Sequence, residues 1–179
     1  MTASPPDCPL CGAADSSEYA RLNEKAYWQC DVCELVYLAG VHHLEPAEEM
    51  ARYELHENDP GDAGHREFLR RLTRHLLPYL DDGASGLDYG AGPAPILARM
   101  LEARGFSMTL YDPFFSSDDT ALEGWYDFIT CTETAEHFHN PAKEFARFNR
   151  LLRPGGWIGI MTRRLERLED LPVDFLDWH

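Results

Sequence analysis

The fold is decided by the segment LDYGAGP (residues 87–93), which joins a predicted strand, 86–89, to a predicted helix, 93–104. Its two glycines, Gly90 and Gly92, let the backbone come close to a ligand. Doubly wound sheets bind their ligands at this place, the carboxyl end of a strand. A strand, a glycine-rich turn and a helix in this order predict one unit of an α/β domain with a ligand site at its turn.

The same alternation continues along the chain. Residues 63–80 predict a helix with apolar side chains at four-residue spacing. Further strands are predicted at 106–111, 126–132 and 157–162, and a long helix at 135–152. Strands that alternate with helices indicate an α/β fold with a mainly parallel sheet flanked by helices.

Four of the five cysteines lie in two CxxC pairs, CPLC (residues 8–11) and CDVC (residues 30–33), with eighteen residues between the pairs. Two CxxC turns can complete a tetrahedral sulfur site, and this spacing is typical of zinc ribbons. Redox dithiols and ordinary buried cysteines are the alternatives, but neither pair lies in a thioredoxin-like pattern. We predict a Zn²⁺ site, with iron as the alternative metal, formed by Cys8, Cys11, Cys30 and Cys33. Four sulfurs leave no open position, so the metal would be structural.

These patterns divide the chain into three parts. We predict a small zinc-ribbon-like module at residues 1–40, a helical connector at 41–62 and the α/β domain at 63–179. Zinc would contribute folding free energy to a module that is too small to fold alone.

The charge of the chain limits its partners. The 31 acidic and 16 basic residues give a net charge of −15, which repels phosphate backbones and disfavours nucleic acid. The first residues show neither a basic region nor an apolar core, and no apolar run is long enough for a bilayer. We expect a cytoplasmic protein with reduced thiols and no membrane partner.

Asp112 lies twenty residues after Gly92, at the end of the predicted strand 106–111. A carboxylate at this place typically binds the ribose hydroxyls of a nucleoside cofactor. A dinucleotide fingerprint would need a third glycine where the chain has Pro95, and Asp88 would repel a pyrophosphate. S-adenosylmethionine carries a sulfonium and an ammonium instead, so the acidic turn favours it over nicotinamide or flavin dinucleotides.

Four motifs occur in the order LDYGAG (87–92), LYDP (110–113), YDFIT (126–130) and LLRPGG (151–156). Together they resemble the motifs of class I S-adenosylmethionine-dependent methyltransferases, over about residues 63–165. The resemblance implies a Rossmann-like fold and an enzyme of class EC 2.1.1. It also implies that residues 88–92 cradle the methionine end of the cofactor and Asp112 the ribose. The cofactor-binding residues so implied are Asp88, Tyr89, Gly90, Ala91, Gly92, Tyr111, Asp112, Pro113, Cys131, Thr132 and Glu133.

The chain departs from that family pattern at two places. Only eleven residues separate Asp112 from Gly124, so we expect the usual third strand to be short or missing. The adenine contact is then unassigned: Asp118 or Asp119 could supply it, or could form an acidic turn. The C-terminal hairpin also has no room before His179. We expect a truncated chain, and the alternative is a second copy that covers the exposed last strand.

The segment ETAEH (residues 133–137) resembles the Glu-x-x-Glu-His segment of ubiquinone-pathway O-methyltransferases, where such residues are associated with a divalent metal and substrate deprotonation. By this resemblance, Glu136 and His137 are the candidate catalytic residues. The alternative is structural: acidic side chains are favoured in the first turn of a helix by its dipole, and His137 could cap or pack.

The function predicted from these patterns is methyl transfer from S-adenosylmethionine to a small-molecule acceptor. Two alternatives stay open. One is an RNA or ribosomal methyltransferase whose zinc ribbon binds the substrate, which the acidic residues around the ribbon disfavour. The other is a non-catalytic scaffold that binds the cofactor.

Overall fold

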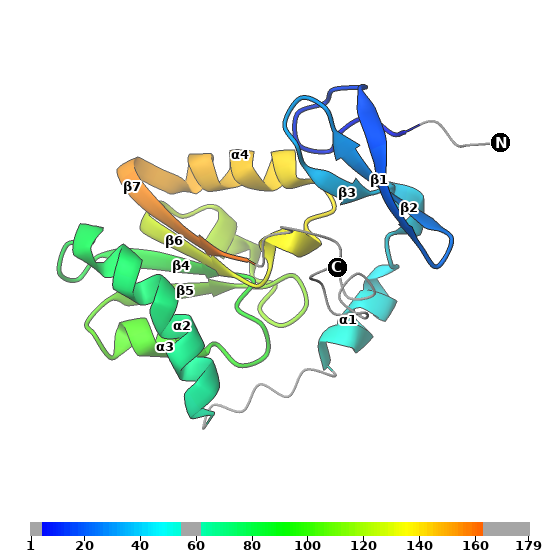
Figure 1. Cartoon of the computed structure of the whole chain (residues 1–179). Helices are drawn as coiled ribbons and strands as arrows, with labels where there is room; N and C mark the ends of the chain where they lie inside the picture. The colour runs from blue at the N-terminus through cyan, green and yellow to red at the C-terminus, as the bar shows by residue number, and fades with distance from the viewer. Residues whose placement is uncertain (1–4, 55–61, 163–179) are drawn as a thin grey trace. The chain divides into compact units, whose positions relative to one another are not determined.

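The computed structural model describes residues 5–54 and 62–162 (Figure 1). Its residues divide into two compact units. The described part of the first unit consists of residues 5–46 and 137–145, and that of the second consists of 47–54, 62–136 and 146–162. Each unit has its own sheet.

The sheet of the first unit is an antiparallel meander of β1 (Ser16–Leu22), β2 (Lys25–Cys30) and β3 (Val36–Leu38). Leu22 pairs with Lys25, so the hairpin loop is only Asn23 and Glu24, with φ of +46° and +68°. Positive φ at both loop residues is the turn that matches the twist of antiparallel strands. β2 and β3 flank the second cysteine pair, whereas β1 was not expected because its sequence, SSEYARL, contains no β-branched residue.

Helices follow the N-terminal sheet, and the helix predicted at 63–80 is present but shorter. After a short 3₁₀ turn, η1 (Gly40–His42), the chain forms α1 (Pro46–Glu54) and then α2 (Ala63–Leu76). The carboxylate of Asp62 accepts a hydrogen bond from the Gly64 N–H (2.7 Å) and so caps α2. Pro78 ends the α-helix before residue 80, and η2 (Leu77–Tyr79) follows as a 3₁₀ turn. The segment NDPG (residues 58–61), whose composition predicts a break between two helices, lies outside the described residues.

The sheet of the second unit is parallel throughout, in the order β5-β4-β6-β7. Its strands are β4 (Ser85–Tyr89), β5 (Ser107–Tyr111), β6 (Tyr126–Thr132) and β7 (Leu152–Met161). The chain passes from β4 to β5 on one side and then to β6 on the other. Such a change of direction opens a crevice at the carboxyl ends of the strands. The predicted α/β, Rossmann-like architecture is therefore confirmed.

The crossover between β5 and β6 is abbreviated, as expected. It contains a 3₁₀ turn, η3 (Asp119–Leu122), and no strand. The Asp118 carboxylate accepts a hydrogen bond from the Thr120 N–H (2.9 Å) and begins that turn. Of the two expectations for Asp118, this contact supports the acidic turn.

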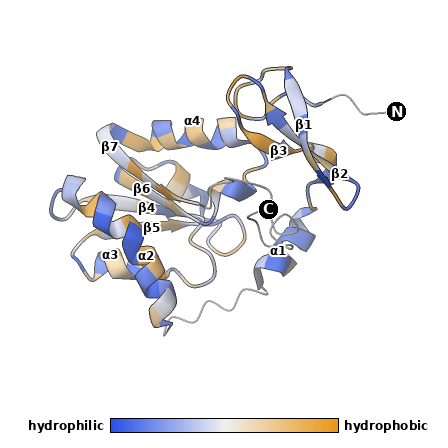
Figure 2. Cartoon of the chain, in the orientation of Figure 1, coloured by the Kyte–Doolittle hydropathy of each residue, from blue (hydrophilic) through white to orange (hydrophobic). Residues whose placement is uncertain are grey.

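Helices cover both faces of this sheet (Figure 1). On one face, α2 and α3 (Ile96–Glu102) bury a cluster formed by Leu69, Leu72, Leu76, Ile96, Leu97, Leu101 and Phe128. On the other, α4 (Pro141–Leu151) packs Phe148 edge-on against Tyr89, with ring centres 4.9 Å apart. Figure 2 shows hydrophobic and hydrophilic residues alternating along α2 and α4, as the one-sided burial of such helices requires. The apolar layers hold the strand ends in fixed positions.

The predicted long helix 135–152 is wrong at its start. Residues 135–137 form a separate 3₁₀ turn, η4 (Ala135–His137), and α4 begins only at Pro141. The Asn140 side chain accepts a hydrogen bond from the Lys143 N–H (3.0 Å), and Pro141 stands where a helix tolerates proline best. Glu136 therefore lies outside the first turn of α4, and the helix dipole does not explain its position.

The last strand also starts earlier than predicted. Tyr126 pairs with Leu152 and Phe128 pairs with Trp157, so residues 153–156, which precede the predicted strand 157–162, form a bulge within β7. Gly155 has a φ of +83° there. Trp157 and Ile158 are 44% and 37% exposed on this edge strand, and its coverage by a second copy stays a prediction.

None of the helices among the described residues is both long enough and apolar enough to cross a membrane.

Candidate functional site

The glycine turn lies at the carboxyl end of β4. Gly90 and Gly92 both have positive φ, +76° and +63°. The N–H groups of Gly90 and Ala91 donate to the Tyr111 carbonyl (2.8 and 3.2 Å), which joins the turn to the end of β5. A Cβ added at Gly90 would overlap the Thr134 side chain, whereas one added at Gly92 would meet no atom within 4 Å. Gly90 therefore serves close packing, and Gly92 leaves the turn open to a ligand.

This difference predicts different effects for two alanine substitutions. Gly90→Ala should lower the free energy of unfolding by about 2 kcal/mol or more, because a left-handed backbone and a steric overlap act together. Gly92→Ala adds only the left-handed backbone and should cost about 1 kcal/mol. Urea denaturation of the two variants measures both values. Equal losses of stability would show that the overlap with Thr134 is relieved without cost.

Asp112 is brought directly against this turn. Its carboxylate is buried, and Oδ2 accepts a hydrogen bond from the Gly92 N–H (2.9 Å). Oδ1 accepts from the N–H groups of Phe114 and Phe115 (2.9 and 3.0 Å). The carboxylate predicted for a ribose and the predicted cofactor turn thus form one hydrogen-bonded unit.

Asp88 lies beneath the turn and faces the protein interior. Its side chain accepts a hydrogen bond from the Thr130 hydroxyl (2.7 Å). Burial raises the pKa of Asp88 to about 6, against the lowering effects of Thr130 and of the Ala98 N–H. These contacts link β4, β6 and the start of α3, so the carboxylate can fix the position of the turn.

The remaining predicted cofactor residues differ in exposure. Tyr89, Tyr111 and Cys131 are buried, and the rings of Tyr89 and Tyr111 lie 5.0 Å apart. Arg147 donates a hydrogen bond to the Tyr89 hydroxyl. Ala91 and Thr132 are half-buried, whereas Pro113 and Glu133 are exposed. The buried members can shape the strand ends, and the others can reach a ligand directly.

Glu136 is the most unusual group beyond β6. Both of its carboxylate oxygens are buried, and neither has a hydrogen-bond partner among the described residues. The hydroxyl of Thr162, just after β7, is in the same condition. Buried polar atoms without partners are rare, and each calls for an explanation such as a bound ligand or ion. Glu133, three residues before Glu136, is exposed and has a φ of +49°. Its N–H donates a hydrogen bond to the Met161 carbonyl (2.7 Å).

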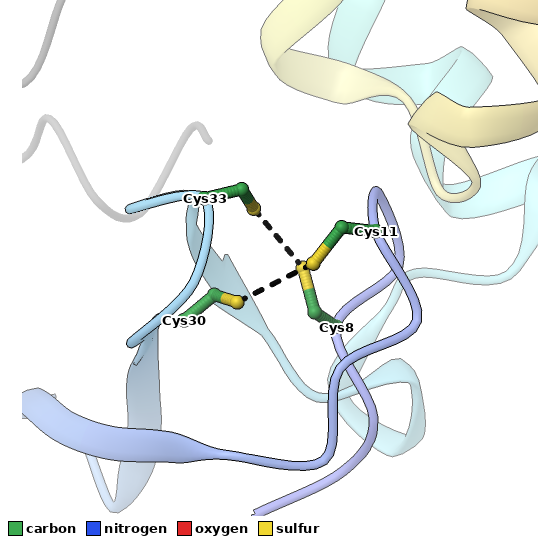
Figure 3. Close-up of side chains that lie close together, drawn as sticks. All are labelled: Cys8, Cys11, Cys30 and Cys33. Atoms are coloured by element: carbon green, nitrogen blue, oxygen red, sulfur yellow. Dashed lines mark hydrogen bonds between the residues drawn. The ribbon is translucent and has the colours of Figure 1, made fainter.

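A second site lies in the first unit, where the four predicted metal ligands meet (Figure 3). The Sγ atoms of Cys8 and Cys33 are 3.6 Å apart, those of Cys11 and Cys30 are 3.5 Å apart, and all four lie within 4.8 Å of one another. Zinc–sulfur bonds of about 2.3 Å in a tetrahedron place the sulfurs about 3.8 Å apart. The arrangement is therefore the size that such a metal requires.

The electrostatics of the four thiols also suit a cation. The Cys33 and Val32 N–H groups help to lower the pKa of Cys30 to about 7. The pKa of Cys33 is shifted upward instead. The Leu35 N–H lowers it, but burial and the other three thiols outweigh that effect and raise it to about 12. Four adjacent thiols cannot all ionise without a positive partner.

Within the described part of the chain, these cysteines form the one group of potential ligands that converges in this way. Glu133, Glu136 and His137, which the sequence resemblance associates with a second metal, do not form such a group. His137 ends η4, next to Glu136 in the chain.

Two kinds of relatives resemble parts of this chain. Ubiquinone biosynthesis O-methyltransferase from Sodalis glossinidius is 31% identical over 78 residues, which cover 44% of this chain and 31% of the relative. Its counterpart from Thiobacillus denitrificans is 33% identical over 79 residues, which cover 44% of this chain and 34% of the relative. The chain thus matches about a third of the length of these curated relatives.

Solved structures of SAM-dependent methyltransferases from Thiobacillus denitrificans and Geobacter sulfurreducens, each in complex with S-adenosyl-L-homocysteine, are 18% and 20% identical. Each has a TM-score of 0.43, with 66% of this chain and 55% of the other covered.

The match to a family is broader than these pairwise similarities. Residues 62–179 match the family described as methyltransferase domain, and this range contains the whole parallel sheet, the glycine turn and Asp112. The chain belongs to the methyltransferase-domain family.

Proposed function

We propose that the chain binds S-adenosylmethionine at the carboxyl ends of β4 and β5 and transfers its methyl group to a small-molecule acceptor. The observation that carries this proposal is the direct hydrogen bond between Gly92 and the Asp112 carboxylate (2.9 Å). It joins a glycine turn that is open to a ligand to the carboxylate expected at a ribose. The pair lies just after the carboxyl ends of β4 and β5, the end of the sheet at which doubly wound folds bind nucleoside cofactors.

The proposal assigns roles to Asp112, to residues 90–92, to Asp88 and to Glu136. Asp112 binds the ribose hydroxyls, and residues 90–92 present backbone groups to the rest of the cofactor. Asp88 holds the turn in position from below. When bound, S-adenosylmethionine supplies an electrophilic methyl group, so orienting the acceptor is the main task of the protein. Glu136 accepts the proton that a hydroxyl acceptor loses, a contribution of about 10²- to 10⁴-fold, and its buried carboxylate without a hydrogen-bond partner among the described residues supports this role. We propose no separate proton transfer for His137.

A small-molecule acceptor fits two observations. The net charge of −15 disfavours a nucleic-acid substrate. The curated relatives carry the name of an O-methyltransferase of ubiquinone biosynthesis. From these relatives we adopt only the class of substrate, a small organic methyl acceptor. The matched segment covers only about a third of their length.

We further propose that Cys8, Cys11, Cys30 and Cys33 hold one structural Zn²⁺. The sulfur separations fit a tetrahedral site, and four protein ligands leave no position for a substrate. Cys8 and Cys30 also belong to the small core that contains Trp28 and Tyr37. The metal would thus join the two CxxC turns to the meander.

Calorimetric titration with S-adenosylmethionine and S-adenosylhomocysteine, with NADH as the control ligand, tests the proposed cofactor. We expect micromolar binding of both sulfur compounds and none of NADH. NADH binding alone would assign the glycine turn to a dinucleotide. Binding of none of the three would contradict the proposed cofactor site.

A further inference from the structure

Helix α1 contributes an aromatic and acidic surface next to the proposed cofactor site. The Tyr53 hydroxyl donates a hydrogen bond to Glu49 Oε1 (2.9 Å), one turn earlier in the same helix. The Tyr53 ring packs against the ring of Phe114, with centres 5.6 Å apart and planes tilted by 44°. Phe114 is itself tied to Asp112, whose Oδ1 accepts its N–H (2.9 Å). The helix is therefore connected through two rings to the carboxylate proposed for the ribose.

The electrostatics around Tyr53 show which charges meet there. Burial raises the pKa of Tyr53 far above its usual range, and the nearby Glu49 carboxylate raises it further. The charges of Asp112 and Glu136 act in the same direction. The Tyr53 hydroxyl thus contacts the Glu49 carboxylate and lies in the negative field of two further carboxylates, Asp112 after β5 and Glu136 in η4.

Within this cluster, Glu136 is the carboxylate that most needs a positively charged partner. Its two oxygens are buried and have no hydrogen-bond partner among the described residues. A buried carboxylate in that condition is stabilised strongly by a positive charge placed against it. The ring faces of Tyr53 and Phe114 add a second kind of surface that attracts cations. The site therefore favours a ligand that carries positive charge between the ribose end and Glu136.

We propose that Glu136, Glu49 and Tyr53 recognise the sulfonium charge of S-adenosylmethionine and so bind this cofactor more tightly than S-adenosylhomocysteine. This inference rests on the proposed function, because the sulfonium is next to the ribose in that cofactor. Both molecules carry the same ribose, adenine and amino-acid end, so those contacts cancel in the ratio of their affinities. The methyl transfer removes the charge, and the product is then released more easily than the cofactor.

The test is calorimetry on the wild-type chain and on Glu136→Gln, which keeps the shape of the side chain and removes its charge. Three ligands are compared: S-adenosylmethionine, S-adenosylhomocysteine and sinefungin, which carries an aminated carbon in place of the methylated sulfur. The wild type should bind the two charged ligands more tightly than S-adenosylhomocysteine. Glu136→Gln should weaken their binding about tenfold and leave that of S-adenosylhomocysteine nearly unchanged.

Two further variants on α1 separate a specific role from a general charge effect. Glu49→Gln should reduce the preference for the charged ligands, because Glu49 is half-buried beside Tyr53. Glu48→Gln removes the same charge from an exposed neighbour on the same helix and is the matched control. The control should leave the ratio of affinities unchanged.

The outcomes distinguish this inference from the function on which it rests. If the wild type binds none of the three ligands, the proposed cofactor site is wrong. If it binds S-adenosylmethionine and S-adenosylhomocysteine equally, or if Glu136→Gln weakens both to the same extent, the cofactor site stands and sulfonium recognition is wrong. Should Glu136→Gln not fold, the comparison of Glu49→Gln with Glu48→Gln decides: equal ratios in the two variants overturn the inference.

Discussion

Replacing Cys30 by serine is expected to unfold the N-terminal sheet while the parallel sheet stays folded. Cys30 is completely buried, and its Sγ lies 3.5 Å from that of Cys11. Zinc bound by four thiolates contributes about 10–16 kcal/mol to the folding of small modules, far more than the short meander can supply from its own core. Loss of one sulfur should therefore abolish both the metal site and the packing of Trp28.

Two measurements check this expectation. Zinc content per chain should fall from one to near zero in Cys30→Ser. Hydrogen exchange, followed by mass spectrometry, should lose protection across β1, β2 and β3. A chelator should produce the same exchange pattern in the wild type.

Cys131→Ser is the matched control, because Cys131 is equally buried but lies in β6 of the other sheet. Its zinc content should equal that of the wild type. A Cys30→Ser chain that keeps its zinc and its protection would show that the four cysteines do not hold a structural metal.

Asp112→Ala is expected to lower the affinity for S-adenosylhomocysteine by about 100-fold or more. Hydrogen bonds to a charged group contribute about 1.5–3 kcal/mol each, and a ribose offers two hydroxyls to this carboxylate. The substitution also removes the acceptor of the Gly92 N–H, so the glycine turn loses its connection to the end of β5. Asp112→Asn keeps one acceptor oxygen and should show a smaller loss of affinity.

Calorimetry gives the affinities, and thermal denaturation of the unliganded variants shows whether the turn is also destabilised. Glu123→Ala removes an exposed carboxylate from the end of η3 and serves as the control. It should bind S-adenosylhomocysteine like the wild type. Wild-type affinity in Asp112→Ala would contradict the ribose assignment, whatever the stability of that variant.

Several features of this chain were predictable because they depend on neighbouring residues alone. The strand 126–132 agrees with β6 residue for residue, since its apolar run is bounded by a glycine and by polar residues. Gly90 and Gly92 were predictable because only glycine adopts their backbone conformation without cost. The cysteine spacing likewise predicted that four sulfurs would meet, and they do.

Other features were not predictable because distant contacts decide them. The helical pattern of 135–152 continues through Asn140 and Pro141, and only the capping contact of Asn140 shows that α4 begins there. The hairpin that pairs β1 with β2 compensates for the weak strand preference of SSEYARL. Predictions from local pattern are least reliable where such tertiary contacts compete with it.

The sequence by itself determined the alternation of strands and helices in the parallel sheet, the glycine turn, the convergence of four cysteines and the position of Asp112 at a strand end. These follow from periodicity, from backbone conformation and from ligand spacing, which are local properties. Only the tertiary structure decided that Asp112 binds the Gly92 N–H, that Asp88 faces inward and that Tyr53 on α1 packs against Phe114. Burial and charge at a site depend on which segments the fold brings together, and neither can be calculated from a segment alone.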